Sequence, residues 1–156
     1  MAFLSSSSKT LCVSPRISPP ESRPSGLPFV FVDRSLGRLE VPELLRAGGV
    51  ELVTLAEHYG MPADESIDDT TWIKESAERD WIAFMKDERI RRRPAEREAL
   101  QRSAARCFCM ANGNLKSPVM AERYLTNLAA IAEASSRPGP FLYAVHADRI
   151  GRLAIG

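Results

Sequence analysis

The sequence predicts an α/β protein: a three-layer α/β/α sandwich with a mainly parallel central sheet and a C-terminal β-hairpin. Short, mostly apolar runs, as expected of strands buried on both faces, alternate with segments of helical periodicity. The connections between them are short, which favours right-handed crossovers between parallel strands. The runs expected as parallel strands span residues 29–32, 50–55, 81–85 and 107–110. Two last runs, 141–146 and 149–154, are joined by a short turn and predict the hairpin.

Helices are expected between these strands, because apolar residues recur there at helical spacing and cap signals flank them. The four predicted helices cover about residues 39–47, 69–79, 94–105 and 117–134. Asp69 is expected to be the N-cap of the second, and the last is expected to be one continuous helix that begins at Ser117-Pro118. The polar stretch between the second strand and Asp69 is expected to be a loop, with Asp64 and Glu65 on its surface.

Length and composition suit one compact domain. The chain has 156 residues, 44% of them hydrophobic, and we expect the domain over residues 28–156, after a disordered Ser- and Pro-rich tail, residues 1–27. A formal charge of +1 gives no overall field for nucleic acid or a membrane, so such a site must rest on a local cluster. Three cysteines at no framework spacing favour a reducing, cytoplasmic location. No apolar run approaches the roughly 18 residues of a membrane span.

Three aspartates are expected to meet at one edge of the sheet. Asp33 follows the first apolar strand, Asp87 follows the third, and Asp69 opens the helix between them. In a parallel sheet, these positions face the edge where ligands bind. Carboxylates that share a site repel one another unless a cation or a proton relieves the repulsion, and Mg²⁺ or Mn²⁺ prefers such hard oxygen ligands. The pattern therefore predicts that the three aspartates are metal ligands and catalytic residues.

Each of these aspartates also fits an ordinary structural role, and this alternative stays open. Asp33 and Asp69 could cap the helices that follow them, and Asp87 could serve in a turn. The recurrence of an aspartate after two apolar strands is what favours the metal site. Asp68 could take the place of its neighbour Asp69.

A basic cluster surrounds Asp87 and predicts contacts with RNA phosphates or with an acidic partner segment. The candidate residues of this cluster are Lys86, Arg89, Arg91, Arg92 and Arg93. Two further candidates, Arg34 and Ser35, directly follow Asp33. The triple Arg91 to Arg93 contains no acid and carries the prediction. For Arg97 and Arg102, a solvated helix face with acid–base pairs is the preferred interpretation. Cys107 and Cys109 alternate along a strand and are expected to be buried on one face rather than to bind zinc.

Four sequence blocks resemble the PIN-like domain proteins, nearest the small VapC-type toxins of bacterial toxin–antitoxin pairs. In order along the chain, the blocks read FVDRSLGR, LLRAGGVEL, DxxWI and WIAFMKDERIRRRPAER. The resemblance runs from Pro28 to the C-terminus. It implies an α/β/α sandwich, a ribonuclease activity that depends on Mg²⁺ or Mn²⁺, and neutralisation by a cognate antitoxin protein; a homodimer is left open. By the same resemblance, the family's acidic motif positions are matched by Asp33, Asp69 and Asp87.

One feature departs from the family pattern. Larger PIN nucleases carry a further acidic residue on a helix after the first strand. No residue of this sequence clearly matches it, and the nearby candidates are Glu40, Glu43 and Glu57. We predict a metal-dependent endoribonuclease, the toxin of a type II toxin–antitoxin pair, that hydrolyses RNA phosphodiester bonds with a metal-activated water. Two alternatives remain: a PIN-like domain of weak catalytic activity that binds RNA or a protein partner, and a small DNA nuclease that uses the same acids.

Overall fold

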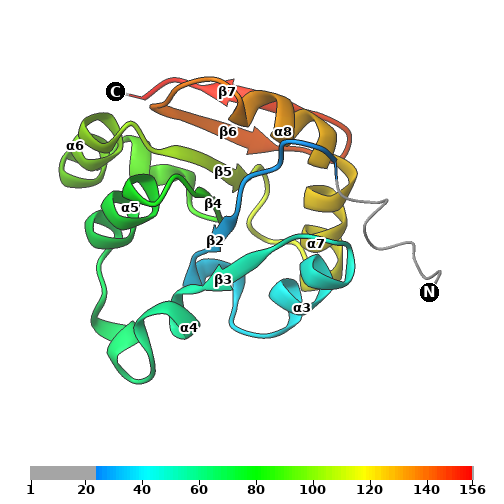
Figure 1. Ribbon diagram of the computed structural model, residues 1–156, viewed down its shortest axis with the longest axis horizontal. Helices are drawn as coiled ribbons and strands as arrows, with labels where there is room; N and C mark the ends of the chain where they lie inside the picture. Colours follow the sequence, from blue (N-terminus) through cyan, green and yellow to red (C-terminus); the bar gives the residue numbers. More distant parts are fainter. Residues whose placement is uncertain (1–23, 156) are drawn as a thin grey trace, which may run out of the picture.

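The computed structural model describes residues 24–155 and contains a six-stranded sheet (Figure 1). Its strands are β2 (Val30–Val32), β3 (Leu52–Thr54), β4 (Ile82–Met85), β5 (Arg106–Met110), β6 (Phe141–Val145) and β7 (Ile150–Leu153). Their order is β3-β2-β4-β5-β6-β7, and every neighbouring pair is parallel except β6 and β7. The predicted sheet, mainly parallel with a C-terminal hairpin, is confirmed. Residues 1–23 of the expected tail lie outside the described residues.

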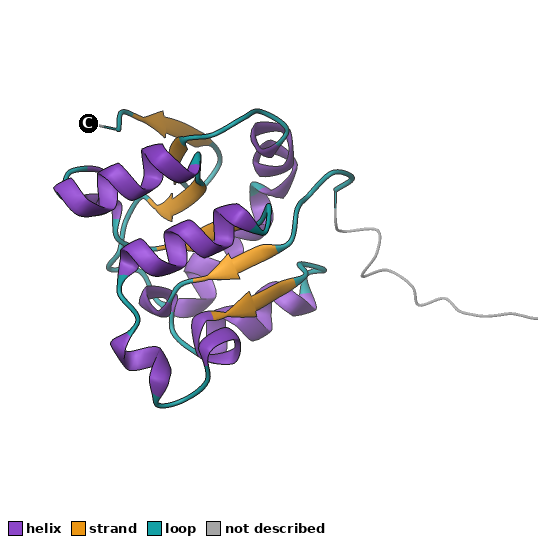
Figure 2. Cartoon of the chain, turned by 60° about the vertical axis from the view of Figure 1, so that its left-hand side comes forward, coloured by secondary structure: helices purple, strands orange, loops and turns teal. Residues whose placement is uncertain are grey.

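Helices cover both faces of the sheet, which confirms the predicted three layers (Figures 1 and 2). The helices are α3 (Glu40–Ala47), α4 (Leu55–Tyr59), α5 (Asp69–Glu78), α6 (Pro94–Ser103), α7 (Ser117–Thr126) and α8 (Leu128–Ser135). Three short 3-10 helices are η3 (Arg34–Leu36), η4 (Ala63–Ser66) and η5 (Glu88–Arg91). Core residues of α3, α7 and α8 pack on one face, and those of α4, α5 and α6 on the other. Within residues 24–155, every helix is too short or too polar to cross a membrane.

Alternate residues of the strands supply the two halves of the core. In β2, Val30 and Val32 pack on the side of α3, α7 and α8, whereas Phe31 packs on the side of α5 and α6. Cys107 and Cys109 of β5 join Phe31 in its cluster, so the prediction that both are buried on one face is confirmed. Burial raises the pKa of both thiols, that of Cys109 to about 12, and both are therefore neutral at physiological pH.

The strand order creates a topological switch point between β2 and β4. From β2 the chain moves to β3 on one side, and α5 then leads it to β4 on the other side of β2. The register pairs Val30 with Ile82 and Val32 with Phe84, so the carboxyl ends of β2 and β4 lie level. In open α/β sheets, ligands bind beyond the strand ends at such a point. The fold therefore directs the residues that follow these two strands to a common edge.

The stretch expected to be a loop begins with helix α4. The side chain of Thr54 accepts a hydrogen bond from the backbone N–H of Glu57 at 3.1 Å, and the Glu57 carboxylate accepts one from Thr54 N–H at 3.0 Å. This capping box starts a helix at Leu55, so β3 ends earlier than expected. The T-x-x-E spacing is visible in the sequence and could have predicted the helix start.

The helix expected over 117–134 is two helices, because Asn127 interrupts it. Asn127 adopts φ −99° and ψ 11°, and it is buried between α7 and α8. Its side-chain amide donates to the carbonyl of Arg123 at 2.8 Å and to that of His146 at 2.9 Å. The second bond ties the break to the hairpin, a tertiary contact that helical periodicity does not reveal.

Tyr124 of α7 links this helix to two strands, and its loss tests that link. Its buried hydroxyl donates to the carbonyl oxygens of Met85 at 2.7 Å and Phe108 at 3.0 Å. Tyr124→Phe is expected to lower the free energy of unfolding by about 1–2 kcal/mol, because two buried acceptors lose their donor. Urea denaturation measures the change. Tyr143→Phe is the control, since that hydroxyl makes no hydrogen bond within residues 24–155; equal losses in both variants would contradict the link.

Candidate metal site

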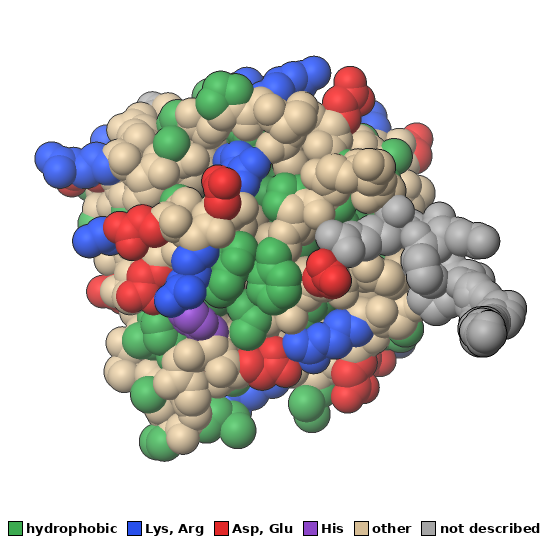
Figure 3. Space-filling view, viewed as in Figure 1, with side chains coloured by type: hydrophobic (Ala, Val, Ile, Leu, Met, Phe, Trp, Pro, Cys, Tyr) green, Lys and Arg blue, Asp and Glu red, His purple; other side chains and the backbone are tan. Residues whose placement is uncertain are grey.

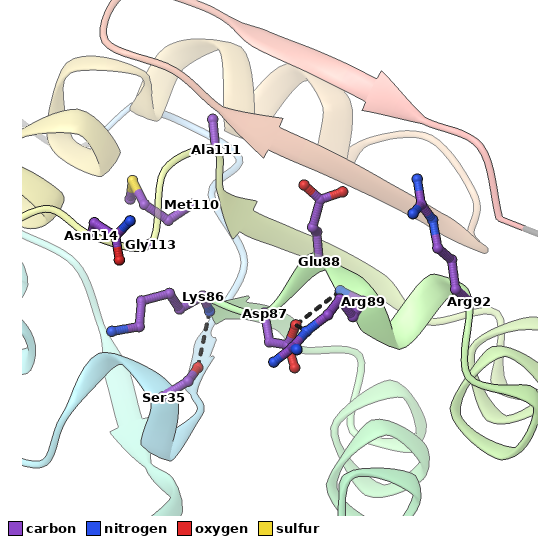
Figure 4. A pocket seen from close by; sticks show the side chains of 10 residues that line it. All are labelled: Ser35, Lys86, Asp87, Glu88, Arg89, Arg92, Met110, Ala111, Gly113 and Asn114. Atoms are coloured by element: carbon purple, nitrogen blue, oxygen red, sulfur yellow. Dashed lines mark hydrogen bonds and ion pairs between the residues drawn. The ribbon is translucent and has the colours of Figure 1, made fainter.

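Asp33 stands at the carboxyl end of β2, where it caps η3. Its Oδ2 accepts hydrogen bonds from the backbone N–H of Ser35 at 3.2 Å and from the Ser35 hydroxyl at 2.7 Å. The same hydroxyl accepts a hydrogen bond from Lys86 N–H at 2.9 Å (Figure 4). Ser35 therefore joins the ends of β2 and β4, and its hydroxyl both donates and accepts a hydrogen bond within the protein.

The second carboxylate oxygen of Asp33, Oδ1, is buried and has no hydrogen-bond partner among the described residues. The residue as a whole is 6% exposed. Burial raises the pKa of Asp33, and the negative charge of Asp69 pushes it in the same direction, against the hydrogen bonds from Ser35. A buried carboxylate oxygen without a protein partner is costly, and a proton, a cation or a bound water relieves that cost.

Asp69 lies in the first turn of α5 and is not its N-cap, contrary to the prediction. Asp68 caps the helix by accepting a hydrogen bond from Thr71 N–H at 3.1 Å, and its hydrogen bonds lower the pKa of its carboxyl. Because Asp68 fills that role, Asp69 is available for another. Its Oδ1 accepts a hydrogen bond from the indole N–H of Trp72 at 2.8 Å, which orients the carboxylate.

Asp87 follows β4 and caps η5. Its Oδ1 accepts from Arg89 backbone N–H at 3.0 Å and from Arg89 Nε at 2.9 Å, and its Oδ2 accepts from Arg93 Nη2 at 2.8 Å. Burial alone would raise the pKa of Asp87, but the hydrogen bonds from Arg89 and Arg93 outweigh it, and the pKa is lowered. Asp87 is therefore a charged carboxylate at neutral pH.

Arg93 joins two of the three aspartates. Besides its bond to Asp87, its Nη1 lies 3.7 Å from Oδ2 of Asp69. As the side chains lie, residues 24–155 contain no group of three His, Cys, Asp or Glu that could hold a metal ion. The donor chemistry nevertheless fits a divalent cation, since Asp33 Oδ1 lacks a partner and all three residues supply hard oxygen ligands. A cation shared by all three acids would have to replace Arg93.

A cavity of about 690 Å³ opens beside Asp87. Its lining residues are Ser35, Lys86, Asp87, Glu88, Arg89, Arg92, Met110, Ala111, Gly113 and Asn114. Figure 4 shows Lys86 extending toward Gly113 and Asn114, whereas Arg92 turns away from Asp87. A Cβ on Gly113 would lie 3.3 Å from Cγ of Lys86, so the loop approaches Lys86 closely. The sequence indicated only a turn there, because nothing in it pairs this loop with β4.

Most of the predicted nucleic-acid contacts have partners inside the protein, as Ser35 and Arg93 already do with the aspartates. Arg91 donates to the carbonyl of Ala154 at 3.1 Å and to Glu88 at 3.2 Å, and only 17% of its side chain is exposed. Arg34 donates to the carbonyls of Glu65, at 3.2 Å, and Ile67. Arg89 is exposed at the cavity although its Nε donates to Asp87, and Arg92 is exposed there as well.

Comparison with known proteins identifies the family of the chain. The family model described as a PIN like domain matches residues 28–112, which include all three aspartates. The chain belongs to the PIN-like domain family. It is 46% identical over 127 residues, 81% of this chain and 92% of the relative, to a Mycobacterium tuberculosis protein named "Putative ribonuclease VapC45". No solved structure matches the chain.

The further acid of larger PIN nucleases has no clear counterpart in this PIN-like domain. Glu57 serves in the capping box and pairs with Arg46 at 2.7 Å, and the hydrogen bond from Arg46 lowers its pKa. Glu40 and Glu43 are exposed in the first turn of α3. The surface position expected for Asp64 is wrong: it is 2% exposed and pairs with the guanidinium of Arg38, a partner that lies 26 residues away.

The buried charge of Asp33 predicts a pH-dependent stability. Because its pKa is raised in the folded chain, protonated Asp33 stabilises the fold below the ordinary value of 3.8, and this contribution is lost as pH rises through the folded value. Asp33→Asn is therefore expected to raise the free energy of unfolding at pH 7.5 by about 1 kcal/mol, with a smaller gain at pH 4.

Urea denaturation in EDTA at the two pH values measures this gain. The exposed Asp148 provides the matched control, and Asp148→Asn should leave the stability nearly unchanged. A loss of stability in Asp33→Asn at pH 7.5 would show that burial does not penalise the Asp33 carboxylate.

Proposed function

We propose that this protein is an endoribonuclease that depends on Mg²⁺ or Mn²⁺. The observation that carries the proposal is the buried, unpartnered Oδ1 of Asp33, which lies at the switch point of the sheet, interacts with the charge of Asp69 and shares its sheet edge with Asp87. Unpaired polar atoms of this kind are costly and concentrate at functional sites. The 46% identity to a relative named as a ribonuclease supports the same reaction class.

In this proposal, the carboxylates of Asp33, Asp69 and Asp87 hold the cation. When bound, a divalent cation supplies a nucleophilic hydroxide at neutral pH and stabilises negative charge on the phosphodiester. The protein keeps the ligands oriented: Ser35 holds Asp33 through Oδ2, so that Oδ1 stays available, and Trp72 holds Asp69. Loss of such a supporting hydrogen bond typically lowers metal affinity or activity by about 10- to 100-fold.

The RNA is proposed to enter along the cavity beside Asp87. Lys86, Arg89 and Arg92 line it and carry the charge to contact phosphates, while the exposed Asn114 offers an amide to a base. On the face seen in Figure 3, acidic and basic side chains are interspersed, and the whole chain carries only +1. We therefore attribute RNA affinity to this local cluster, not to a broad positive surface.

The biological role proposed is that of a toxin neutralised by a cognate antitoxin protein, in accord with the VapC name of the relative. The test begins with the neighbouring gene: a small DNA-binding protein encoded there should co-purify with this chain and suppress its RNA cleavage. If an equimolar amount of the protein encoded by the neighbouring gene left RNA cleavage unchanged, that protein would not be the antitoxin of this chain.

The second candidate is a PIN-like domain that binds RNA or a protein with little catalysis. Two observations favour it: Glu57 is engaged with Arg46 and Thr54, and Arg93 binds two of the three aspartates. The cleavage experiment below separates the two candidates, since a folded wild type that binds RNA without cutting it would support the second.

Removal of a proposed ligand is expected to abolish cleavage. Asp87→Asn and Asp33→Asn should each lower the rate of cleavage of a mixed RNA pool by about 100-fold or more, since metal catalysis is worth several kcal/mol. Gel analysis with Mg²⁺, Mn²⁺ or EDTA measures the rate, and Asp148→Asn is the control that should retain activity. Equal cleavage by wild type and Asp87→Asn would indicate a different site or a contaminant.

Arg92→Ala is expected to weaken RNA binding several-fold and to reduce the slope of log K against log salt by about 0.7, the loss of one phosphate contact. Fluorescence anisotropy with a labelled single-stranded RNA, in the Asp33→Asn background to prevent cleavage, measures both. Arg102→Ala removes the same charge at the far end of α6, where Arg102 pairs with Glu98, and should change little. An unchanged salt slope in Arg92→Ala would remove Arg92 from the RNA contacts.

A further inference from the structure

Arg93 binds the two aspartates that a metal ion would need. It directs one guanidinium nitrogen to Asp87 at 2.8 Å and the other to Asp69 at 3.7 Å. Two carboxylates drawn toward one site repel each other, and a cation between them relieves that repulsion. The forked guanidinium suits this role, because its nitrogens diverge in one plane and can serve two acceptors. Arg93 thus supplies, between these two acids, charge compensation that a metal ion would otherwise supply, while Arg89 binds the other oxygen of Asp87 at 2.9 Å.

The backbone of Arg93 is fixed, while its side chain can leave. Arg93 is the N-cap of α6, immediately before Pro94, and its carbonyl accepts a hydrogen bond from Arg97 N–H at 2.8 Å. Its side chain is 39% exposed, so the guanidinium reaches water on one side. Partly exposed ion pairs of this kind are weak enough to exchange with another cation.

Asp33, the third aspartate, forms no ion pair with Arg93. Its Oδ1 is buried and unpartnered among the described residues, although Asp33 is close enough to Asp69 for the charge of Asp69 to raise its pKa. Arg93 therefore compensates two of the three carboxylates and leaves the most deeply buried one unsatisfied. A divalent cation would satisfy all three at once.

We propose that Arg93 is a built-in competitor of the divalent cation: it occupies Asp69 and Asp87 until the cation binds, and it must swing into solvent to admit the cation. The inference rests on the proposed metal-dependent function and adds a regulatory device to the same site. Arg93 would raise the cation concentration at which the site fills, because the free energy of cation binding includes the cost of breaking both Arg93 contacts.

A purely structural role for Arg93 makes the opposite prediction. If Arg93 only fastened the segment between η5 and α6 to the acids, its removal would loosen Asp69 and Asp87 and would weaken cation binding or leave it unchanged. The direction of the change in affinity therefore separates competition from support.

The test is isothermal titration of the full chain with Mn²⁺, which needs no RNA and no turnover. Arg93→Gln is expected to bind Mn²⁺ about tenfold more tightly than wild type, as the loss of about 1.4 kcal/mol of competing interaction implies. Arg93→Lys keeps the charge but cannot bridge two acids in the same way. Its affinity for Mn²⁺ should lie between those of wild type and Arg93→Gln. Arg102→Gln removes a charge elsewhere on α6 and should match wild type.

Two results would overturn the inference, and only the second would also reject the proposed metal-dependent function. Equal or weaker Mn²⁺ binding by Arg93→Gln, with a native circular dichroism spectrum and binding abolished by Asp33→Asn, would reject the competition and leave the metal site standing. No Mn²⁺ binding by wild type, Arg93→Gln or Arg93→Lys would reject both the competition and the metal-dependent function. Tighter binding in Arg93→Gln, lost again when Asp33→Asn is added, would support both.

Discussion

The hydroxyl of Ser35 holds together the two strand ends from which the candidate site is built. It donates to Asp33 and accepts from the backbone of Lys86, while the N–H of Asp33 bonds the carbonyl of Phe84. These bonds close the switch point between β2 and β4 and fix one oxygen of Asp33. Because Ser35 satisfies only that oxygen, the other is left buried and without a partner, and the chemistry proposed for the site starts from it.

The candidate site also carries a cost in stability. Burial disfavours the charged form of Asp33, so an ionised carboxylate at this position lowers the stability of the fold. The neighbouring aspartates have other surroundings: Asp87 is stabilised as an anion by two arginines, whereas Asp69 accepts a hydrogen bond from an indole N–H and lies 3.7 Å from Arg93. Three chemically identical side chains therefore have three distinct electrostatic environments, set by the elements that carry them.

Much of this arrangement is readable from the sequence, and the remainder depends on contacts between distant residues. Continuous apolar runs predicted the parallel strands, and an aspartate after two of them predicted a shared edge; the roles of these aspartates as ligands stay a prediction. The start of α4 is readable from the capping box of Thr54 and Glu57. The contact of Arg93 with Asp69, the pairing of Arg38 with Asp64 and the bond from Asn127 to His146 join residues 19 or more positions apart, so no local pattern reveals them.

The hydrogen bond between Trp72 and Asp69 has an optical consequence. The indole of Trp72 is buried, stacks on Phe31 with ring centroids 5.5 Å apart, and donates its N–H to the carboxylate. The emission of an indole responds to the charge at its ring nitrogen, so any change in the occupancy or protonation of Asp69 would alter the intrinsic fluorescence of the unlabelled protein. The chain thus carries its own reporter group at one of the three acids, and Trp81, its other tryptophan, adds a background to the signal.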